Sequence, residues 1–364
     1  MASATKTLAE TDHARFLLDA NLRWGTDLRK MHAAGGIGWG RNPRNEPLRS
    51  ACLKNGLPFL YLEDPYFRSW GLAGQRHASP PVGMMIDTRQ PAYDCTGLGS
   101  EAEARIKHRI ANPADNPGDA LLKFIVSSRL TKYNLPHVPG DGADRSRMRI
   151  GVVDQVASDR SLLFGGAGQE ASNMLCQHAI DRARKEQAVL VIRTHPDVRA
   201  GKSGPALSRE LQTACERQAV AFAFSDAESA HDFLDGVNEV LTLTSGLGFE
   251  ALLKGIGVTT FGAPFYAGWG LTGDLGCETD AVQALERRGG GWPQDALTPR
   301  KTGAVSTSSS PRCLRSSPSG GIRCAAHDAM RCRPCGGLSR GVPWRRSMAS
   351  QRASMEWRPG SGLR

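Results

Sequence analysis

The sequence predicts an α/β protein with open, doubly wound parallel sheets, followed by a C-terminal segment that lacks a core. Two observations support this prediction. From Arg149 onward, short apolar runs alternate with runs of helical periodicity, which is the pattern of βαβ units. From Glu286 onward the alternation stops, and the remaining 79 residues hold no Phe and no Tyr. With 364 residues, the chain is long enough for about two domains.

The first half of the chain predicts a helical segment followed by a small α/β domain. We expect the helical segment over residues 1–34 and the domain over 35–145. Apolar runs indicate the strands of this domain, and Gly and Pro are frequent between them. The expected elements are strands at 58–64 and 84–87, a helix at 118–133 and a linker near 134–148.

The second half predicts a Rossmann-like domain over residues 146–285. Its strands are short apolar runs, as expected for a parallel sheet that is buried on both faces. We expect strands at 149–155, 188–193, 219–224, 239–244 and 257–262, of which the last completes the sheet. We expect helices at 168–186, at 205–216 with Pro205 at the start, from 225–229 onward and at 249–254.

Residues 286–364 carry all of the excess basic charge of the chain. The formal net charge is +10, to which this segment contributes +11 and residues 1–285 contribute −1. A near-neutral body is not typical of a protein that binds a phosphate backbone, so no nucleic-acid partner is expected. The composition predicts disorder in this tail. It is either a basic arm for anionic membranes or nucleic acid, or an out-of-frame continuation, which we favour because the change is abrupt.

Composition excludes several classes of protein. No run approaches the ~20 apolar residues of a membrane-spanning helix. The first residues lack the apolar region of a secretory signal. The nine cysteines are too few and too irregular for a disulfide scaffold, and the CxxC at Cys332 and Cys335 has no second pair to complete a zinc site. We therefore expect a cytoplasmic protein with reduced thiols.

Carboxylates follow two of the predicted strands, and ligands of parallel α/β sheets bind beyond the carboxyl ends of the strands. Glu63 and Asp64 end the strand at 58–64, where side chains alternate between faces, so at most one is expected to face a given cleft. Asp154 and Gln155 end the strand that begins the second domain. Carboxylates at these places can act as a general base, a ligand of substrate hydroxyls or a nucleophile. The alternative for each is to cap the following loop.

The loop after the strand at 188–193 holds His195, Pro196 and Asp197, and Lys202 follows within GlyLysSerGly. A His and a Lys on one loop suit a phosphate leaving group, because both donate hydrogen bonds to developing anionic oxygens. The alternative is a structural histidine. The GlyLysSer triplet is not a phosphate-binding P-loop, because Pro196 stands where the first Gly of that motif is required.

Thr244, Ser245 and Gly246 end the strand at 239–244 and begin a helix that contains Glu250. Free N–H groups at a helix start, with hydroxyls beside them, form an anion site, and Glu250 could accept hydrogen bonds from ribose hydroxyls. The alternative is an ordinary helix cap. The aromatic residues among glycines at 261–272 suit a base or sugar face, or else a packed connector between domains. Together, these signals predict a nucleotide-phosphate cleft.

Seven strings follow one another in an informative order. They are GlyTrpGlyArg (38–41), LeuGluAspProTyrPheArgSer (62–69), LysTyrAsn (132–134), ValValAspGln (152–155), HisProAsp (195–197), ThrSerGlyLeuGlyPheGluAlaLeuLeu (244–253) and PheTyrAlaGlyTrpGlyLeuThr (265–272). In this order, and with the last two highly specific, the chain resembles the capsule polysaccharide biosynthesis family of β-Kdo glycosyltransferases. The resemblance covers roughly 35–275, which is one transferase module.

The resemblance implies a GT-B-like fold of two Rossmann-type domains with the active site between them. It implies transfer of Kdo from CMP-Kdo, with retention of configuration, to a Kdo linker on a phosphatidylglycerol lipid. It implies a peripheral location at the inner face of the cytoplasmic membrane, beside a capsule assembly and export complex. It implies no cofactor and no metal, because His and hydroxyl groups would take the phosphate.

The resemblance also implies roles for residues. Asp154 would be the nucleophile or would stabilise the oxocarbenium ion, and Glu63 or Asp64 would assist acid–base chemistry at the acceptor. Arg68 would pair with the Kdo carboxylate. CMP would be held by Gln155, His195, Pro196, Lys202, Thr244, Ser245, Gly246 and Glu250, with Glu250 at the ribose.

The chain departs from the family pattern at two places. Pro65 replaces the Gly of Leu-Glu-Asp-Gly, and because Pro fixes φ and lacks an N–H, the loop after Glu63 is expected to shift. The tail at 286–364 stands where the family has segments that close the module. We therefore expect the nucleotide domain to fold and transferase activity to be reduced or lost. The alternatives are a nucleotide-sugar-binding remnant without catalysis and a nucleic-acid binder that uses the tail.

Overall fold

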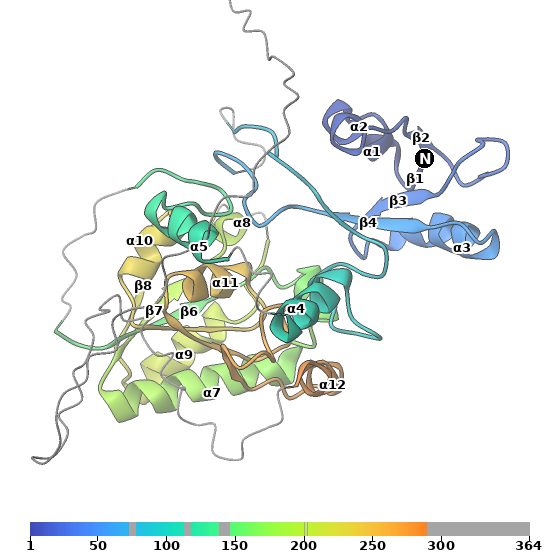
Figure 1. Ribbon diagram of the computed structural model, residues 1–364. Helices are drawn as coiled ribbons and strands as arrows, with labels where there is room; N and C mark the ends of the chain where they lie inside the picture. Colours follow the sequence, from blue (N-terminus) through green and yellow to red (C-terminus); the bar gives the residue numbers. More distant parts are fainter. Residues whose placement is uncertain (73–77, 113–117, 138–145, 200, 202, 290–364) are drawn as a thin grey trace, which may run out of the picture. The chain divides into compact units, whose positions relative to one another are not determined.

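The structure is a computed structural model that describes residues 1–289, except 73–77, 113–117, 138–145, 200 and 202 (Figure 1). The described residues belong to one compact unit. The predicted disorder of the tail concerns residues that lie outside the described part of the chain, apart from 286–289. Within the described part, none of the helices is long and apolar enough to cross a membrane.

The first sheet has five strands in the order β2-β1-β3-β4-β5. All neighbours are parallel except β4 and β5, which are antiparallel. The strands are β1 (Ala2–Ser3), β2 (Arg23–Trp24), β3 (Gly36–Trp39), β4 (Phe59–Glu63) and β5 (Met85–Asp87). The helices of this region are α1 (Lys6–Ala9), α2 (Asp12–Leu18), a short 3-10 helix (Pro43–Asn45) and α3 (Glu46–Lys54).

The predicted strands at 58–64 and 84–87 are confirmed as β4 and β5. Residues 1–34 contain α1 and α2, in agreement with the expected helical segment, but they also supply β1 and β2 to the first sheet. A two-residue strand is too short to show any alternation of apolar and polar residues, so the sequence could not reveal either strand.

The second sheet has six parallel strands in the order β11-β10-β9-β6-β7-β8. The strands are β6 (Arg149–Val153), β7 (Val189–Arg193), β8 (Phe222–Phe224), β9 (Glu239–Thr242), β10 (Gly257–Thr260) and β11 (Gly273–Asp274). The chain starts at β6, runs outward to β8 and then returns to the other side of β6 at β9. Ligands of such sheets bind at this reversal, beyond the carboxyl ends of β6 and β9.

Helices cover both faces of the second sheet (Figure 1). They are α6 (Arg160–Phe164), α7 (Gln169–Glu186), α8 (Pro196–Arg199), α9 (Ser208–Gln218), α10 (Ala230–Asp235), α11 (Gly246–Leu253) and α12 (Thr279–Arg288). The core on the α7 and α9 face includes Leu175, Leu190 and Leu211. The core on the α10 and α11 face includes Phe233 and Val240. Burial on both faces explains why the strands of this sheet are apolar runs.

Three expected elements differ from the structure. The helix expected at 118–133 is α5 (Gly118–Ser127), because Arg129 has a φ of 50° and Thr131 begins a turn that Asn134 closes. The helix expected at 205–216 is α9, which begins at Ser208, so Pro205 lies outside it. The strand at β10 is not the last, since β11 pairs with it.

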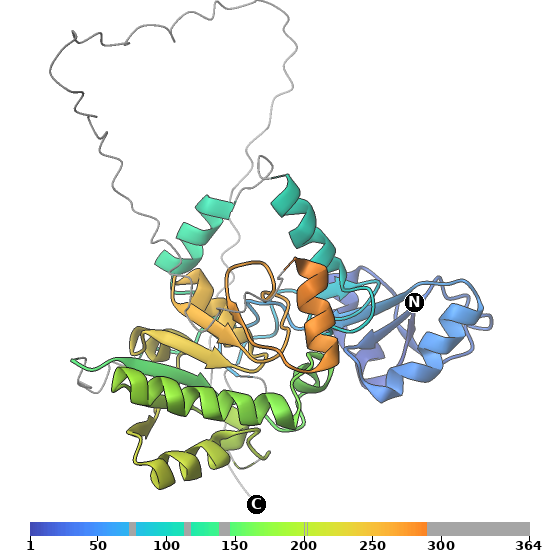
Figure 2. The same cartoon turned by 90° about the horizontal axis from the view of Figure 1, so that it is seen from below.

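The boundary expected at 286 falls inside a helix, because α12 continues to Arg288. Figure 2 shows α12 beside α4 (Glu101–Ala111), and Lys107 of α4 donates a hydrogen bond of 2.9 Å to the carbonyl of Arg287. The last turn of α12 therefore belongs to the folded body of the protein rather than to the tail.

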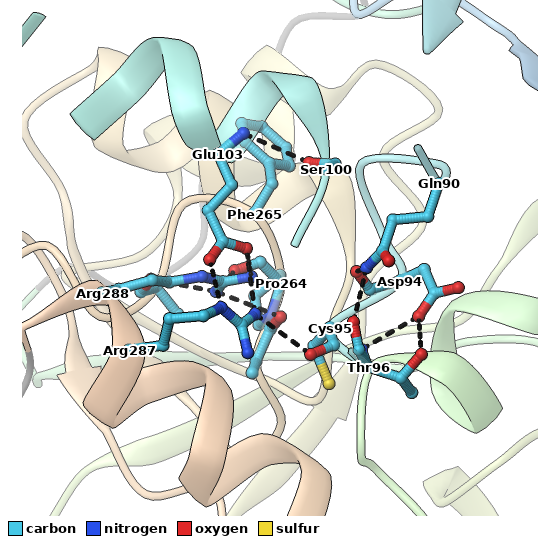
Figure 3. A network of polar contacts seen from close by, with 12 residues as sticks. Gln90, Asp94, Cys95, Thr96, Ser100, Glu103, Pro264, Phe265, Arg287 and Arg288 are labelled. Carbon is cyan, nitrogen blue, oxygen red and sulfur yellow. Dashed lines mark hydrogen bonds and ion pairs between the residues drawn. The ribbon is translucent and has the colours of Figure 1, made fainter. Parts of the chain in front are cut away.

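Glu103 of α4 pairs with two arginines of α12 (Figure 3). Arg287 Nε lies 2.8 Å from Glu103 Oε1, and Arg288 Nη2 lies 3.0 Å from Glu103 Oε2. Burial of Glu103 would raise the pKa of its carboxyl, but the hydrogen bonds and charges of both arginines outweigh it and hold that pKa below its usual value. This cluster joins elements that are 185 residues apart in the sequence.

Candidate functional site

A cleft of about 460 Å³ opens beyond the carboxyl ends of β4, β6, β7 and β9. Residues of both sheets line it. Of the residues predicted for the site, the cleft includes Glu63, Asp64, Asp154, Gln155, His195, Pro196, Thr244, Ser245, Gly246 and Glu250. Arg68 does not line it, and Lys202 lies outside the described residues. A separate cavity of about 530 Å³ beside α9 is lined by none of the predicted residues that the structure describes.

Glu63 is the last residue of β4, and its carboxyl group is poised to titrate near neutrality. Burial raises the pKa of Glu63 to about 7, although a hydrogen bond from Tyr93 and the charge of Lys132 act in the opposite direction. A carboxyl group with a pKa near 7 can take or give a proton at physiological pH. The structure therefore brings a candidate general base or acid into the cleft.

The place of the Glu63 carboxyl is fixed by Tyr93 and Gly40. The Tyr93 hydroxyl accepts a hydrogen bond of 2.9 Å from the Arg41 N–H, which leaves its proton for Glu63. Gly40 has a φ of +49°, and a Cβ there would lie 2.3 Å from Glu63 Oε1 and 2.6 Å from the Tyr93 hydroxyl. Only glycine leaves room for this pair, which explains the second Gly of the GlyTrpGlyArg string.

Asp64 and Arg68 form an ion pair, with 2.7 Å between Oδ1 and Nε. Arg68 also donates to the Ser69 hydroxyl at 3.1 Å. Arg68 is thus paired with Asp64 and does not line the cleft. This placement disagrees with the expectation that Arg68 binds a substrate carboxylate. Glu63 and Asp64 both line the cleft, contrary to the expectation of one, because β4 ends at Glu63 and the alternation of faces ends with it.

The Asp154 carboxylate is 2 % exposed and accepts hydrogen bonds from four backbone N–H groups. One belongs to Gln155, and the others belong to residues 206–208 at the start of α9, at 3.0 to 3.1 Å. A carboxylate that is shared among four donors is a weak nucleophile, because each donor stabilises its charge. This geometry fits the capping alternative for Asp154 better than the nucleophile, and it explains why α9 begins at Ser208.

Asp159 lies five residues beyond Asp154 and also lines the cleft. Its Oδ1 caps α6 by accepting a hydrogen bond of 2.9 Å from the Ser161 N–H. Among the described residues, Oδ2 has no hydrogen-bond or ion-pair partner. The sequence analysis did not single out Asp159, since an Asp before a short helix reads as an ordinary cap.

Gln155 holds together the two strands where the chain reverses. Its Oε1 accepts from the Thr244 N–H at 2.9 Å, and its Nε2 donates to Thr244 Oγ1 at 3.1 Å and to Ser161 Oγ at 3.0 Å. Gln155 is buried, so these bonds replace the hydration that its amide loses. Gln155 therefore sets the position of Thr244 rather than standing free for a ligand.

Ser245 and Gly246 begin α11 at the same reversal. The Ser245 hydroxyl accepts from the Leu247 N–H at 3.3 Å, and the Ser245 carbonyl accepts from the Tyr266 hydroxyl at 2.6 Å. A Cβ on Gly246 would meet open space, so the backbone is accessible from the cleft. A helix start that a ligand can approach this closely suits a phosphate.

His195 follows β7, with Pro196 at the first position of α8. Burial lowers the pKa of His195, and the charge of Asp197 opposes this only in part. Its Nδ1 accepts a hydrogen bond of 3.2 Å from the Asp197 N–H, which assigns the proton of the neutral ring to Nε2. His195 can thus donate one hydrogen bond from Nε2.

Three aromatic rings of the cleft pack together across the two halves of the molecule. The Tyr66 centroid lies 5.2 Å from that of Phe249 and 4.7 Å from that of Phe265. Phe265 belongs to a loop whose carbonyls at Ala263, Pro264 and Ala267 accept from Arg288 Nη1. The aromatic string at 261–272 therefore serves in part as the predicted connector, and Arg288 fixes it (Figure 3).

A family model described as "Capsule polysaccharide biosynthesis protein" matches residues 105–288, about half of the chain. Over 258 residues, the chain is 32 % identical to the capsule polysaccharide modification protein LipA of Neisseria meningitidis serogroup B. That alignment covers 69 % of this chain and 35 % of LipA. It is 29 % identical to the lipopolysaccharide-processing protein LpsZ of Rhizobium meliloti, over 74 % of this chain and 56 % of LpsZ. The chain thus spans about a third to a half of the length of these relatives.

Among solved structures, the chain is similar to the β-Kdo 2,4 transferase of KpsC from Thermosulfurimonas dismutans, with a TM-score of 0.65 and 25 % identity. That match covers 80 % of this chain and 89 % of the other. The β-Kdo 2,7 transferase of the same KpsC shares the fold, with a TM-score of 0.51 and 21 % identity. These likenesses and the two sheets confirm the expected GT-B-like α/β fold with two Rossmann-type halves.

Proposed function

This chain belongs to the capsule polysaccharide biosynthesis protein family, and we propose that it is a glycosyltransferase that moves Kdo from CMP-Kdo to a Kdo-bearing glycolipid. The observation that supports this proposal most is the placement of Glu63, a carboxyl with a pKa of about 7, in one cleft with the helix start at Ser245. Transfer needs a proton acceptor for the sugar hydroxyl and donors for the leaving phosphate, and the cleft supplies both.

In the proposed reaction, the bond from Kdo to the CMP phosphate breaks first, and CMP leaves. A hydroxyl of the acceptor then forms the new glycosidic bond. Glu63 takes the proton of that hydroxyl. The Gly246 N–H at the start of α11, the Thr244 hydroxyl and His195 Nε2 donate to the phosphate, with no metal ion assigned to this task. Glu250 would hold the ribose.

Retention of configuration calls for a carboxylate that forms or stabilises an intermediate at the sugar. We assign this task to Asp159 in place of Asp154, because Asp154 is surrounded by backbone donors while Asp159 Oδ2 is uncommitted. The lipid acceptor would place the protein at the inner face of the cytoplasmic membrane, where the capsule is assembled for export.

The proposal is tested first by thermal unfolding of the full chain with CMP, with UMP and AMP as controls. CMP at 100 times its dissociation constant should stabilise the protein by about 2.7 kcal/mol. The second step is incubation with CMP-Kdo and a synthetic Kdo-terminated glycolipid, followed by mass spectrometry of the product. If the protein binds CMP but forms no product, it is a nucleotide-sugar-binding protein without transferase activity. If it does not bind CMP selectively, the proposal is contradicted.

A further inference from the structure

Lys132 is held in place by both halves of the molecule. Its N–H donates to Glu250 Oε1 of α11 at 2.7 Å. Its carbonyl accepts from the N–H groups of Arg68 and Ser69 at 2.8 and 3.2 Å. The string LysTyrAsn was conspicuous in the sequence, but no role followed from it. The structure shows that the backbone of this residue is tied to the loop after β4 and to the helix after β9.

The Lys132 side chain lines the cleft together with Glu63 and Asp64. Its Nζ lies 5.4 Å from the centroid of the Tyr133 ring. Within the described part of the chain, no carboxylate oxygen lies within the 4.0 Å of an ion pair with this Nζ. Burial would lower the pKa of Lys132, but Tyr133, Asp64 and Glu63 outweigh it, so the ammonium group remains charged.

Three other cationic side chains line the cleft, namely Arg41, Arg160 and Arg193. Arg160 is exposed, whereas Arg41 Nε lies 3.1 Å from Asp94 Oδ2 and Arg193 donates to two backbone carbonyls. Lys132 is half-buried, and its ammonium group has neither an ion pair nor a carbonyl partner among the described residues. Its N–H donors therefore remain for an anionic ligand.

We propose that the Lys132 ammonium group is an anion subsite of the cleft and binds an anionic oxygen of the donor sugar nucleotide. This inference rests on the proposed function and refines it. In this inference, Lys132 takes the place of Arg68 as the cation that binds the donor, because Arg68 is already paired with Asp64. The donor carries two anionic groups, a phosphate and the carboxylate of the sugar acid, and both present the oxygen that an ammonium group binds.

The test compares Lys132→Met with the wild-type full chain by isothermal titration with CMP and with CMP-Kdo. The matched control is Lys123→Met, which changes an exposed lysine of α5 outside the cleft lining. Loss of a charged hydrogen bond should weaken binding roughly 10- to 100-fold in Lys132→Met and leave Lys123→Met unchanged. Thermal unfolding of each variant without ligand shows whether it is folded.

The two ligands distinguish the two anionic groups. Weaker binding of CMP-Kdo alone assigns Lys132 to the sugar carboxylate, and weaker binding of both ligands assigns it to the phosphate. If wild-type protein binds both ligands and a folded Lys132→Met variant binds them equally well, the subsite is refuted while the proposed function stands. If wild-type protein binds neither ligand, the proposed function fails and the subsite fails with it.

Discussion

The rims of the two sheets each present a carboxylate at the end of a strand, and the two carboxylates differ in what surrounds them. Asp154 after β6 accepts from four backbone N–H groups and is closed off from solvent. Glu63 at the end of β4 has the Tyr93 hydroxyl as its partner and has a pKa of about 7. Position at a strand end thus brings a carboxylate to the cleft, but the donors around it decide whether it anchors the fold or reacts.

The largest effect is expected for Glu63→Gln. Loss of the proton acceptor should lower kcat by about 10²- to 10⁴-fold, measured as the initial rate of CMP release from CMP-Kdo with acceptor present. CMP affinity should not change, because the groups assigned to the phosphate lie at the ends of β7 and β9. A variant that keeps a third of the wild-type rate would show that Glu63 is not the base.

The same variant has a pH signature in stability. The pKa of Glu63 is about 7 in the folded protein against 4.5 for a glutamate exposed to water, so the folded state binds the proton more tightly. Wild-type stability therefore falls as pH rises from about 4.5 through 7, whereas Glu63→Gln lacks this loss. In urea unfolding, the stability of the variant relative to that of the wild type should increase between pH 5 and pH 8.

Arg288→Met should have an effect of comparable size to that of Glu63→Gln, but on the free energy of unfolding alone. Arg288 is 5 % exposed, and its removal would leave Glu103 and three backbone carbonyls without their shared donor. The cost of breaking a buried pair in this way is about 3–5 kcal/mol, measured by urea unfolding. The exposed Lys107→Met is the control and should change stability by less than about 0.5 kcal/mol. Equal stability of the two variants would contradict the role assigned to Arg288.

Asp154→Asn and Asp159→Asn should differ in stability, by less than the loss expected for Arg288→Met. Asn at 154 has one acceptor oxygen for four donors and should cost about 2–3 kcal/mol of stability. Asn at 159 caps a helix as well as Asp, so the fold should keep its stability while turnover falls. The reverse result, with turnover lost only at 154 in a stable protein, would return the nucleophile to Asp154.

The smallest effect is expected for Tyr93→Phe. The Tyr93 hydrogen bond lowers the pKa of Glu63 from where burial alone would place it. Without the hydroxyl, the acid limb of the rate profile should move upward from about pH 7, so that the rate falls more at pH 6 than at pH 9. An unchanged profile would mean that Tyr93 does not orient the carboxyl.

Five of the six strands of the second sheet could be predicted, because they are local runs whose burial shows in their composition, whereas β11 has only two residues. Sequence also located the cleft, since strand ends of a parallel sheet meet at one edge. The pairing of Asp64 with Arg68 was not predicted, because the two residues lie outside any helix, where spacing alone does not indicate contact. The expected role for Arg68 came from the resemblance, which carried no information on that contact.

Other features depend on contacts between distant residues, and no local pattern reports them. Tyr93 reaches Glu63 from 30 positions away in the sequence, and its hydroxyl also receives the N–H of Arg41, 52 positions away. The donors around Asp154 come from the start of α9, more than 50 positions later. Lys132 could be noticed as part of a string, but its lack of an ion pair among the described residues is a property of the folded cleft.

The ion pair between Glu103 and Arg288 affects the order in which parts of the protein fold during synthesis. During translation, Glu103 leaves the ribosome 185 residues before its partner, and at 5–20 residues per second the interval is roughly 10–40 s. The loop that carries Phe265 leaves the ribosome only 21 to 25 residues before Arg288, so for roughly 1–5 s it lacks the side chain that fixes its carbonyls. The first sheet can form early on the nascent chain, whereas the aromatic wall of the cleft must wait for α12. Completion of the cleft is therefore a late event, and release of α12 from the exit tunnel sets its time.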